Sequence, residues 1–174
     1  EISSESLGGA DSHAKLSGIA HFACDSDDEC IRKIKVLLSY LPSNNMDDPP
    51  ILAQTDPPDR IDDALGEIVP ADPKKAYDVH DIIDHIFDKE SFFEVQASFA
   101  SNAVIGFARL GGRSVGVVAN QPIAYAGCLD IDSSGKIARF VRTCDAFNIP
   151  IITLVDVPGY LPGSRQEHGG VIKH

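Results

Sequence analysis

The chain has 174 residues, 43% of them hydrophobic, and a formal net charge of −11 at neutral pH, a composition typical of a globular protein. The negative charge disfavours nucleic acid as a partner, because phosphate binding requires clustered Lys and Arg. No apolar run approaches the roughly 20 residues of a membrane-spanning helix, so we expect no membrane span. The four cysteines form no C-x-x-C pair and the histidines show no metal-ligand spacing, which predicts reduced thiols and no metal.

Residues 1–23 alternate small residues with glycines and are predicted to form a loop. From Asp27 onward, apolar residues recur at three- and four-residue spacing behind an acidic first turn, which predicts a helix that Pro42 ends. The expected buried stripe of this helix is Cys30, Ile34, Leu37, Leu38 and Leu41.

Most of the eleven prolines lie in or next to residues 43–77, which also contain many Asp residues. We predict an extended interdomain linker there, since proline prevents regular hydrogen-bonded ladders. The charge also changes along the chain: residues 1–90 hold 20 Asp and Glu against 8 Lys and Arg, whereas residues 91–174 hold 6 against 7.

After the linker, a helix is predicted over 78–88, with a buried stripe of Val79, Ile82, Ile83, Ile86 and Phe87. Strands are predicted over 92–97, 103–109 and 114–119, and Gly111-Gly112 between the last two indicates a hairpin.

A third helix is predicted behind a cap within residues 132–134, followed by an apolar strand over 149–155. Its expected buried stripe is Ile137, Phe140, Val141, Cys144 and Phe147. A strand, a helix and a second strand in this order indicate a crossover unit in an α/β layer structure.

A Pro- and Gly-rich turn, residues 157–163, directly follows the last strand. Open α/β sheets place ligands at the carboxyl ends of their strands. A glycine there can present a backbone N–H to a developing negative oxygen, so an oxyanion hole is chemically reasonable. The alternative is that proline and glycine merely reverse the chain.

A second candidate is Asn120-Gln121-Pro122, where a strand ends in two amides that could bind a urea-like or carbonyl ligand. Turn formation is the alternative. The chain contains neither a G-x-S-x-G elbow nor a Walker sequence, so backbone electrostatics is the favoured mechanism.

The order and spacing of several motifs resemble the β subunits of propionyl-CoA carboxylase, which are carboxyltransferase subunits of biotin-dependent acyl-CoA carboxylases. These motifs are Leu7-Gly8-Gly9-Ala10, Ile105-Gly106-Phe107-Ala108-Arg109, Asn120-Gln121-Pro122, Gly127-Cys128-Leu129-Asp130, Cys144-Asp145-Ala146-Phe147-Asn148, Asp156-Val157-Pro158-Gly159 and Gly169-Gly170-Val171-Ile172.

The resemblance implies an α/β fold of the crotonase/ClpP type, a ββα superhelix, built in this family as two halves. By this resemblance, residues 1–42 are the tail of the N-terminal half, residues 43–77 the linker, and residues 78–174 the first part of the C-terminal half.

The resemblance further implies transfer of a carboxyl group from carboxybiotin to the α carbon of a short-chain acyl-CoA, with propionyl-CoA the favoured substrate. Biotin would be carried on a separate carrier protein or domain. The implied partners are acyl-CoA, the biotin carboxylase and biotin carrier subunit, and further copies of the full subunit. The implied location is the cytoplasm, or the mitochondrial matrix in a eukaryote.

Carried over by motif, Gly159 and Tyr160 supply part of an oxyanion site for the biotin enolate. The other implied contacts to substrate or biotin are Asn120, Gln121, Gly127, Pro158, Leu161 and Gly163. Lys136, Arg139 and Arg142 share one face of the third helix and could attract a CoA phosphate. A solvated helix face is the alternative for these three.

In the family, a Gly-Gly-Ala segment at a helix start completes each oxyanion hole. Neither of those segments is present here, since Gly8-Gly9-Ala10 belongs to a different motif. We therefore expect these 174 residues not to complete a catalytic cycle alone. Two other readings stay open. One is the carboxyltransferase subunit of a sodium-pumping methylmalonyl-CoA decarboxylase, which shares these motifs. The other is a non-catalytic assembly module with exposed apolar edges.

Overall fold

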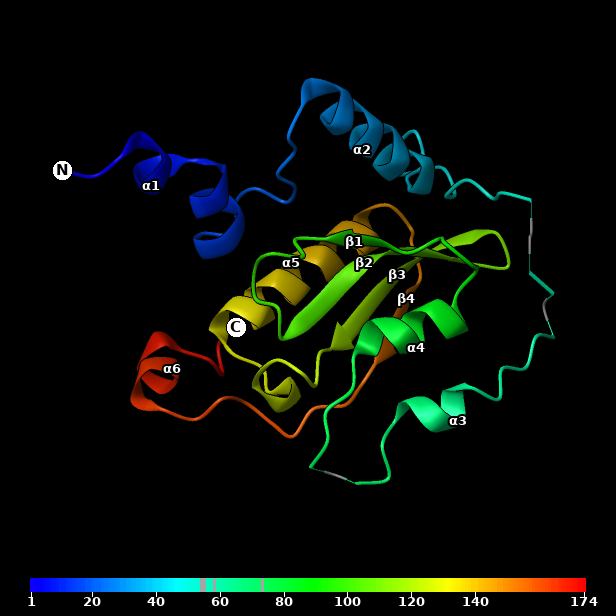
Figure 1. Ribbon diagram of the computed structural model, residues 1–174. Helices are drawn as coiled ribbons and strands as arrows, with labels where there is room; N and C mark the ends of the chain where they lie inside the picture. Colours follow the sequence, from blue (N-terminus) through cyan, green and yellow to red (C-terminus); the bar gives the residue numbers. More distant parts are fainter. Residues whose placement is uncertain (54–55, 58, 73) are drawn as a thin grey trace.

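The structure is a computed structural model that describes residues 1–53, 56–57, 59–72 and 74–174. The described residues form one sheet in the order β1-β2-β3-β4 (Figure 1). Its strands are β1 (Phe93–Val95), β2 (Ala103–Leu110), β3 (Arg113–Asn120) and β4 (Ile151–Leu154). The three strands predicted over 92–119 and the strand predicted over 149–155 are therefore confirmed, with shorter bounds for β1 and β4.

The hairpin between β2 and β3 is as tight as the glycine pair predicts. The two strands pair antiparallel from Ala103 opposite Asn120 to Leu110 opposite Arg113. Both turn residues, Gly111 and Gly112, have positive φ angles of 60° and 77°, which glycine adopts at little cost. The N–H groups of the two glycines donate hydrogen bonds to the two carboxylate oxygens of Asp88, at 2.9 and 2.7 Å.

The predicted crossover unit is confirmed, because β3 and β4 are parallel and α5 (Ile131–Ala146) connects them. The predicted cap position is wrong. Asp130 caps the helix: its carboxylate accepts a hydrogen bond from the Ser133 N–H, and the Ser133 hydroxyl accepts one from the Asp130 N–H. This reciprocal capping box satisfies two backbone donors at the helix start.

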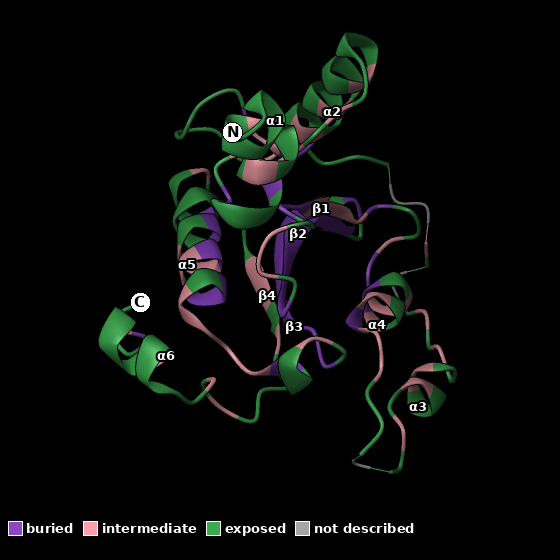
Figure 2. Ribbon diagram, turned by 60° about the vertical axis from the view of Figure 1, so that its left-hand side comes forward, coloured by how far each residue is buried: buried purple, intermediate pink, exposed green. Residues whose placement is uncertain are grey.

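Helices cover both faces of the sheet, and Figure 2 shows the buried strands between α5 on one side and α4 (Val79–Ile86) on the other. On the α4 face, Val79, Ile83 and Phe87 pack against the inward side chains of β2 and β3. The helix predicted over 78–88 and the centre of its stripe are thus confirmed, and the Asp78 carboxylate caps its first turn.

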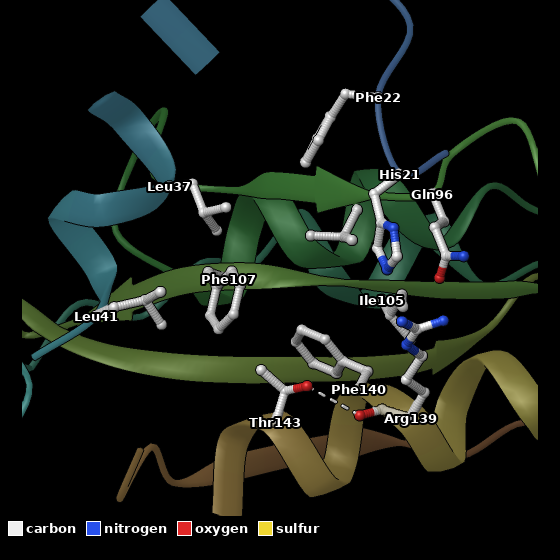
Figure 3. A pocket seen from close by; sticks show the side chains of 11 residues that line it. His21, Phe22, Leu37, Leu41, Gln96, Ile105, Phe107, Arg139, Phe140 and Thr143 are labelled. Carbon is white, nitrogen blue, oxygen red and sulfur yellow. Dashed lines mark hydrogen bonds between the residues drawn. The ribbon is translucent and has the colours of Figure 1, made fainter. Parts of the chain in front are cut away.

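On the opposite face lies α2 (Asp27–Tyr40), capped by Ser26. The helix was predicted correctly, but its buried stripe was not: Ile34 and Leu38 are 49% and 59% exposed, and Tyr40 is buried instead. Leu37 and Leu41 contact the core from the edge. A cavity of about 270 Å³ remains between α2, the sheet and α5 (Figure 3).

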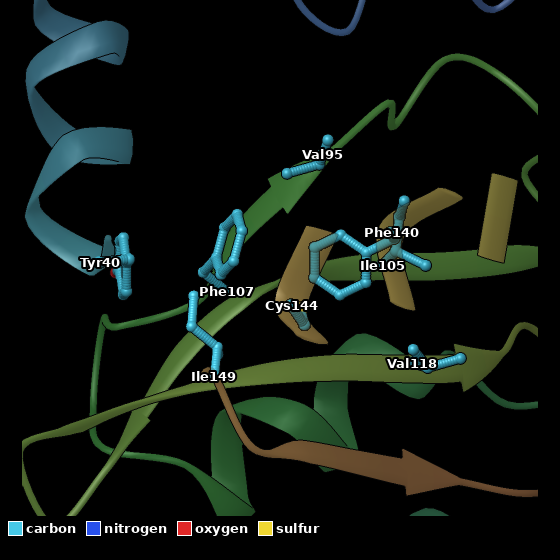
Figure 4. Packing of buried hydrophobic residues seen from close by; sticks show 8 residues of the cluster. All are labelled: Tyr40, Val95, Ile105, Phe107, Val118, Phe140, Cys144 and Ile149. Carbon is cyan, nitrogen blue, oxygen red and sulfur yellow. The ribbon is translucent and has the colours of Figure 1, made fainter. Parts of the chain in front are cut away.

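The core on this face is aromatic, and Figure 4 shows Phe107 of β2 between Tyr40 of α2 and Phe140 of α5. The Phe107 ring centroid lies 5.8 Å from that of Tyr40 and 5.1 Å from that of Phe140. Cys144 of α5 is fully buried, and its sulfur lies where a side chain on Gly116 would have to sit. This tight contact between α5 and β3 explains the glycine in a buried strand.

Residues 1–23 are only in part the loop that we predicted. They contain a short helix, α1 (Ser4–Gly8), and a π-helical turn over Ser12–Leu16. None of the helices in the described ranges is long and apolar enough to cross a membrane.

The described residues of the segment predicted as a linker contain one short helix, α3 (Leu65–Ile68), and are otherwise mostly exposed. The segment is nevertheless anchored to the sheet layers. The Arg60 guanidinium donates hydrogen bonds to the carbonyl oxygens of His85 and Phe87 at 2.6 and 3.0 Å. The division into a tail, a linker and a second half stays a prediction.

Candidate functional site

The turn after β4 is held in place by a short stretch of parallel pairing. Leu129 donates its N–H to the carbonyl oxygen of Gly159 at 3.0 Å and accepts a hydrogen bond from the Leu161 N–H at 2.7 Å. These two bonds lie on either side of Tyr160. The loop before α5 therefore fixes the centre of the turn, and the capped start of α5 fixes that loop.

Two backbone donors in this turn have no internal partner. Within the described residues, neither the N–H of Gly159 nor that of Tyr160 donates a hydrogen bond to another protein group. Gly159 has a φ of 146° and Gly163 a φ of 136°, conformations that side chains rarely adopt. Tyr160 is 56% exposed. The turn thus combines a constrained backbone with unpaired N–H groups at the carboxyl end of a strand.

Asn120 lies at the end of β3, next to this turn. Its amide nitrogen donates to the carbonyl oxygen of Gly127 at 3.2 Å, and its amide oxygen accepts from the N–H of Asp156 at 3.4 Å. Gly127 has a φ of 77°, and a side chain there would lie 2.7 Å from the Asp156 carbonyl oxygen. Asn120 and Gly127 therefore join the two loops at this sheet edge, and their role in ligand binding stays a prediction.

Gln121 is buried, and its side-chain amide is hydrogen-bonded to residues at the start of α4. Its amide oxygen accepts from the Val79 N–H at 3.2 Å, and its amide nitrogen donates to the Asp78 carboxylate at 2.8 Å. His80 lies between Asp78 and Glu94, with nitrogen to oxygen distances of 2.6 and 2.9 Å. The hydrogen bond to Glu94 is the main reason that the pKa of His80 is raised to about 9.

A cavity of about 520 Å³ opens beside the turn. Asp156, Val157 and Pro158 form one wall, and the segment before α4, including Lys74 and Tyr77, forms another. The Tyr77 hydroxyl donates a hydrogen bond to the Asp156 carboxylate at 2.8 Å. Burial, with a further effect of this bond, raises the pKa of Tyr77 to about 12. Neither Leu161, which is half-buried, nor Gly163, which precedes α6 (Ser164–Gly169), is among the residues that line this cavity.

Lys136 does not present its ammonium to solvent. It is only 3% exposed, and its Nζ donates hydrogen bonds to the carbonyl oxygens of Gln96, Phe99 and Ala103 at 3.0, 2.7 and 2.7 Å. Burial lowers its pKa to about 8. The prediction that Lys136 attracts a phosphate is therefore wrong, and so is the solvated-face alternative for this residue. Arg139 and Arg142 are exposed.

Asn102 is a residue that sequence reasoning missed. It is fully buried, and its amide nitrogen donates to the Cys128 carbonyl oxygen at 2.9 Å and to the Ser133 hydroxyl at 3.1 Å. Its backbone carbonyl oxygen accepts a hydrogen bond from the Gln121 N–H at 3.0 Å. Asn102 thus supports the loop that pairs with the turn. Its place directly before a strand reads as ordinary turn chemistry, so no signal in the sequence marks it.

The described part of the chain contains no group of three or more His, Cys, Asp or Glu side chains placed to hold a metal ion. The groups that the described residues present at this sheet edge are backbone N–H groups, amides, the half-buried Tyr77 hydroxyl and nearby carboxylates.

Comparison with known proteins identifies the family. The model of the carboxyl transferase domain matches residues 1–174. The chain is 55% identical to the carboxyltransferase subunit of propionyl-CoA carboxylase from Haloferax mediterranei, over the whole chain and 34% of that relative. It is 50% identical to the alpha subunit of methylmalonyl-CoA decarboxylase from Veillonella parvula, again over the whole chain and 34% of the relative.

The fold agrees with this. The transcarboxylase 12S core, crystallised as a hexamer with methylmalonyl-coenzyme A and methylmalonic acid bound, matches with a TM-score of 0.97 and 48% identity. The match covers the whole of this chain and 33% of that one. The chain thus spans about a third of the length of its relatives. The expected α/β crotonase-type fold and the resemblance drawn from sequence motifs are confirmed, and the chain belongs to the carboxyl transferase domain family.

Proposed function

We propose that this chain takes part in transferring a carboxyl group between carboxybiotin and the α carbon of a short-chain acyl-CoA, and that its 157–163 turn faces the ureido group of biotin. The observation that carries the proposal is the pair of unpaired N–H groups, of Gly159 and Tyr160, in a turn held by Leu129. Such fixed donors are what a developing oxyanion requires.

Carboxybiotin, when bound, supplies the carboxyl group and develops negative charge on its ureido oxygen. The N–H groups of the turn can donate hydrogen bonds to that charge without reorganising, because the two bonds of Leu129 already fix the backbone. The residues present fit a neutral, urea-like group, since the free groups of the turn are donors. The Asn120 amide holds Asp156, next to the turn, to β3, whereas the Gln121 amide joins the end of β3 to the start of α4.

The substrate, biotin carrier and partner subunits are part of the same proposal. Propionyl-CoA is the favoured substrate, a separate biotin carrier and biotin carboxylase are the expected partners, and the full protein is expected to be a homo-oligomer. The 55% identity to a propionyl-CoA carboxylase subunit supports this reading. The 50% identity to a methylmalonyl-CoA decarboxylase subunit supports the second candidate, in which the same site works in the reverse direction.

The test compares Gly159→Pro with Gly159→Ala in the full-length protein. Both replacements strain the backbone, because φ is 146°, but only proline removes the N–H. The measurement is methylmalonyl-CoA-dependent carboxylation of free biotin. Proline should lower kcat by about 10²-fold more than alanine, the size of effect seen when one oxyanion donor is lost.

Gly66→Ala is the matched control, because Gly66 lies in α3 with open space around it and should leave activity unchanged. Circular dichroism must show that each variant is folded. Equal losses in the proline and alanine variants would reduce the turn to a structural role. Dependence of the decarboxylation reaction on sodium would favour the decarboxylase.

A further inference from the structure

The cavity between α2, the sheet and α5 lies on the face of the sheet opposite α4, and none of its lining residues borders the cavity beside the 157–163 turn. Its volume is about 270 Å³. Leu37, Phe107 and Phe140 form much of its apolar wall (Figure 3). The cavity is thus close in size to sites that bind small organic molecules, which begin at about 300 Å³.

Polar side chains gather at one end of this cavity. Figure 3 shows His21, Gln96 and Arg139 together there, with the imidazole reaching toward the guanidinium. The Nδ1 atom of His21 is paired with the carbonyl oxygen of Ile19 at 3.1 Å, which leaves Nε2 unpaired among the described residues. The cavity therefore has an apolar body and a polar end at which the Arg139 guanidinium is an available donor.

The polar end is positively charged and lacks a counterion. None of the residues that line the cavity is acidic. Arg139 forms no salt bridge and its guanidinium no hydrogen bond with the described residues. A guanidinium carries its charge at every physiological pH and is shaped to bind a carboxylate through two parallel hydrogen bonds. Arg139 is exposed at the mouth of the cavity, so its charge is solvated there and is accessible to an anionic ligand.

We propose that this cavity binds a small carboxylic acid with an unbranched apolar tail. The tail lies against Leu37, Phe107 and Phe140, and the carboxylate accepts hydrogen bonds from the guanidinium of Arg139. This site is separate from the proposed biotin site and does not depend on it.

Isothermal titration calorimetry on the purified full-length protein tests the site with butanoate, hexanoate, octanoate and octan-1-ol. Each added methylene should tighten binding about fourfold until the cavity is full, the ratio that follows from burying one methylene. Octan-1-ol should bind at least about tenfold more weakly than octanoate, because it lacks the charge that Arg139 recognises.

Arg139→Gln should weaken octanoate binding by about tenfold or more and leave octan-1-ol binding unchanged. Arg142→Gln is the matched control: it removes a charge from the same helix, at an exposed residue outside the cavity, and should have no effect. Thermal unfolding checks that both variants fold. The proposal would be overturned if octanoate did not bind saturably, if affinity did not depend on tail length, or if octanoate and octan-1-ol bound equally well. The last two outcomes can be seen with the wild-type protein alone.

Discussion

The Tyr77 hydroxyl donates a hydrogen bond of 2.8 Å to the carboxylate of Asp156 across 79 residues of sequence. Asp156 directly precedes the Val157-Pro158-Gly159 turn, and its own N–H is held by Asn120. The segment before α4 and the end of β3 therefore meet at Asp156. The position of Asp156, and with it the start of the turn, depends on both contacts.

Tyr77→Phe should lower carboxyl-transfer activity while the protein stays folded. The change removes one hydrogen bond, whose net value is about 1 kcal/mol, and it frees the Asp156 side chain beside the turn. We expect kcat/KM in the biotin carboxylation assay to fall about fivefold, the ratio equivalent to that energy. Tyr125→Phe is the control, because Tyr125 is exposed and its hydroxyl has no partner among the described residues. Equal activities of the two variants would contradict a role for the Tyr77 bond.

Lys136→Met should destabilise the protein strongly. The Nζ atom donates hydrogen bonds to several carbonyl oxygens of the 96–103 segment. In the variant these acceptors would remain buried without a donor. Loss of a buried hydrogen-bond network of this kind costs about 2–4 kcal/mol. Urea-induced unfolding measures the change in free energy. Arg142→Met, on an exposed position of the same helix, should change it by less than about 0.5 kcal/mol; comparable losses in the two variants would show that the carbonyl contacts contribute little.

Much of the sheet could be predicted from the sequence because its signals are local. The Gly111-Gly112 pair specifies its own turn conformation, and the runs on either side are almost continuously apolar, which is typical of strands buried on both faces. The third helix and the strand after it were also predicted, but the predicted cap lay within residues 132–134, and Asp130 is the actual cap. Several polar residues in succession can each cap a helix, and only the geometry selects one.

The face of α2 that is buried could not be predicted, because periodicity shows which residues share a face and not which face meets the sheet. Ile34 and Leu38 are apolar yet exposed, whereas Tyr40 is buried and donates its hydroxyl hydrogen bond to the Ser91 carbonyl oxygen at 2.5 Å. The contact depends on a partner 51 residues away.

The turn of the candidate site could be located from the sequence, but not its supports. Proline and glycine after a buried strand mark the turn itself. Asn102, Tyr77 and Lys136 act through contacts with distant backbone, and a single Asn, Tyr or Lys carries no local sign of such a partner. The buried lysine in particular looks like an ordinary surface residue of an amphipathic helix.

The last prediction concerns pH and the ion pairs of His80. Its imidazole lies between the carboxylates of Asp78 and Glu94, with the Gln121 amide 3.3 Å from Nδ1. Its pKa is raised from 6.5 to about 9, mainly by Glu94. A raised pKa means that the folded state binds the proton more tightly than the unfolded state, so the stabilisation is complete below pH 6.5 and is lost as the pH rises through about 9.

Compared with His80→Gln, the wild type should therefore be more stable at about pH 6 by about 1–2 kcal/mol, after allowance for solvent screening of a side chain that is 36% exposed. The difference should shrink toward zero above about pH 9.5. Guanidinium unfolding at several pH values measures it, and NMR titration of the imidazole measures the pKa directly. His168→Gln, at an exposed histidine in α6, should show no such pH dependence. An NMR pKa near 6.5 for His80, or a stability difference that does not change with pH, would mean that the two carboxylates do not hold the imidazole as a cation.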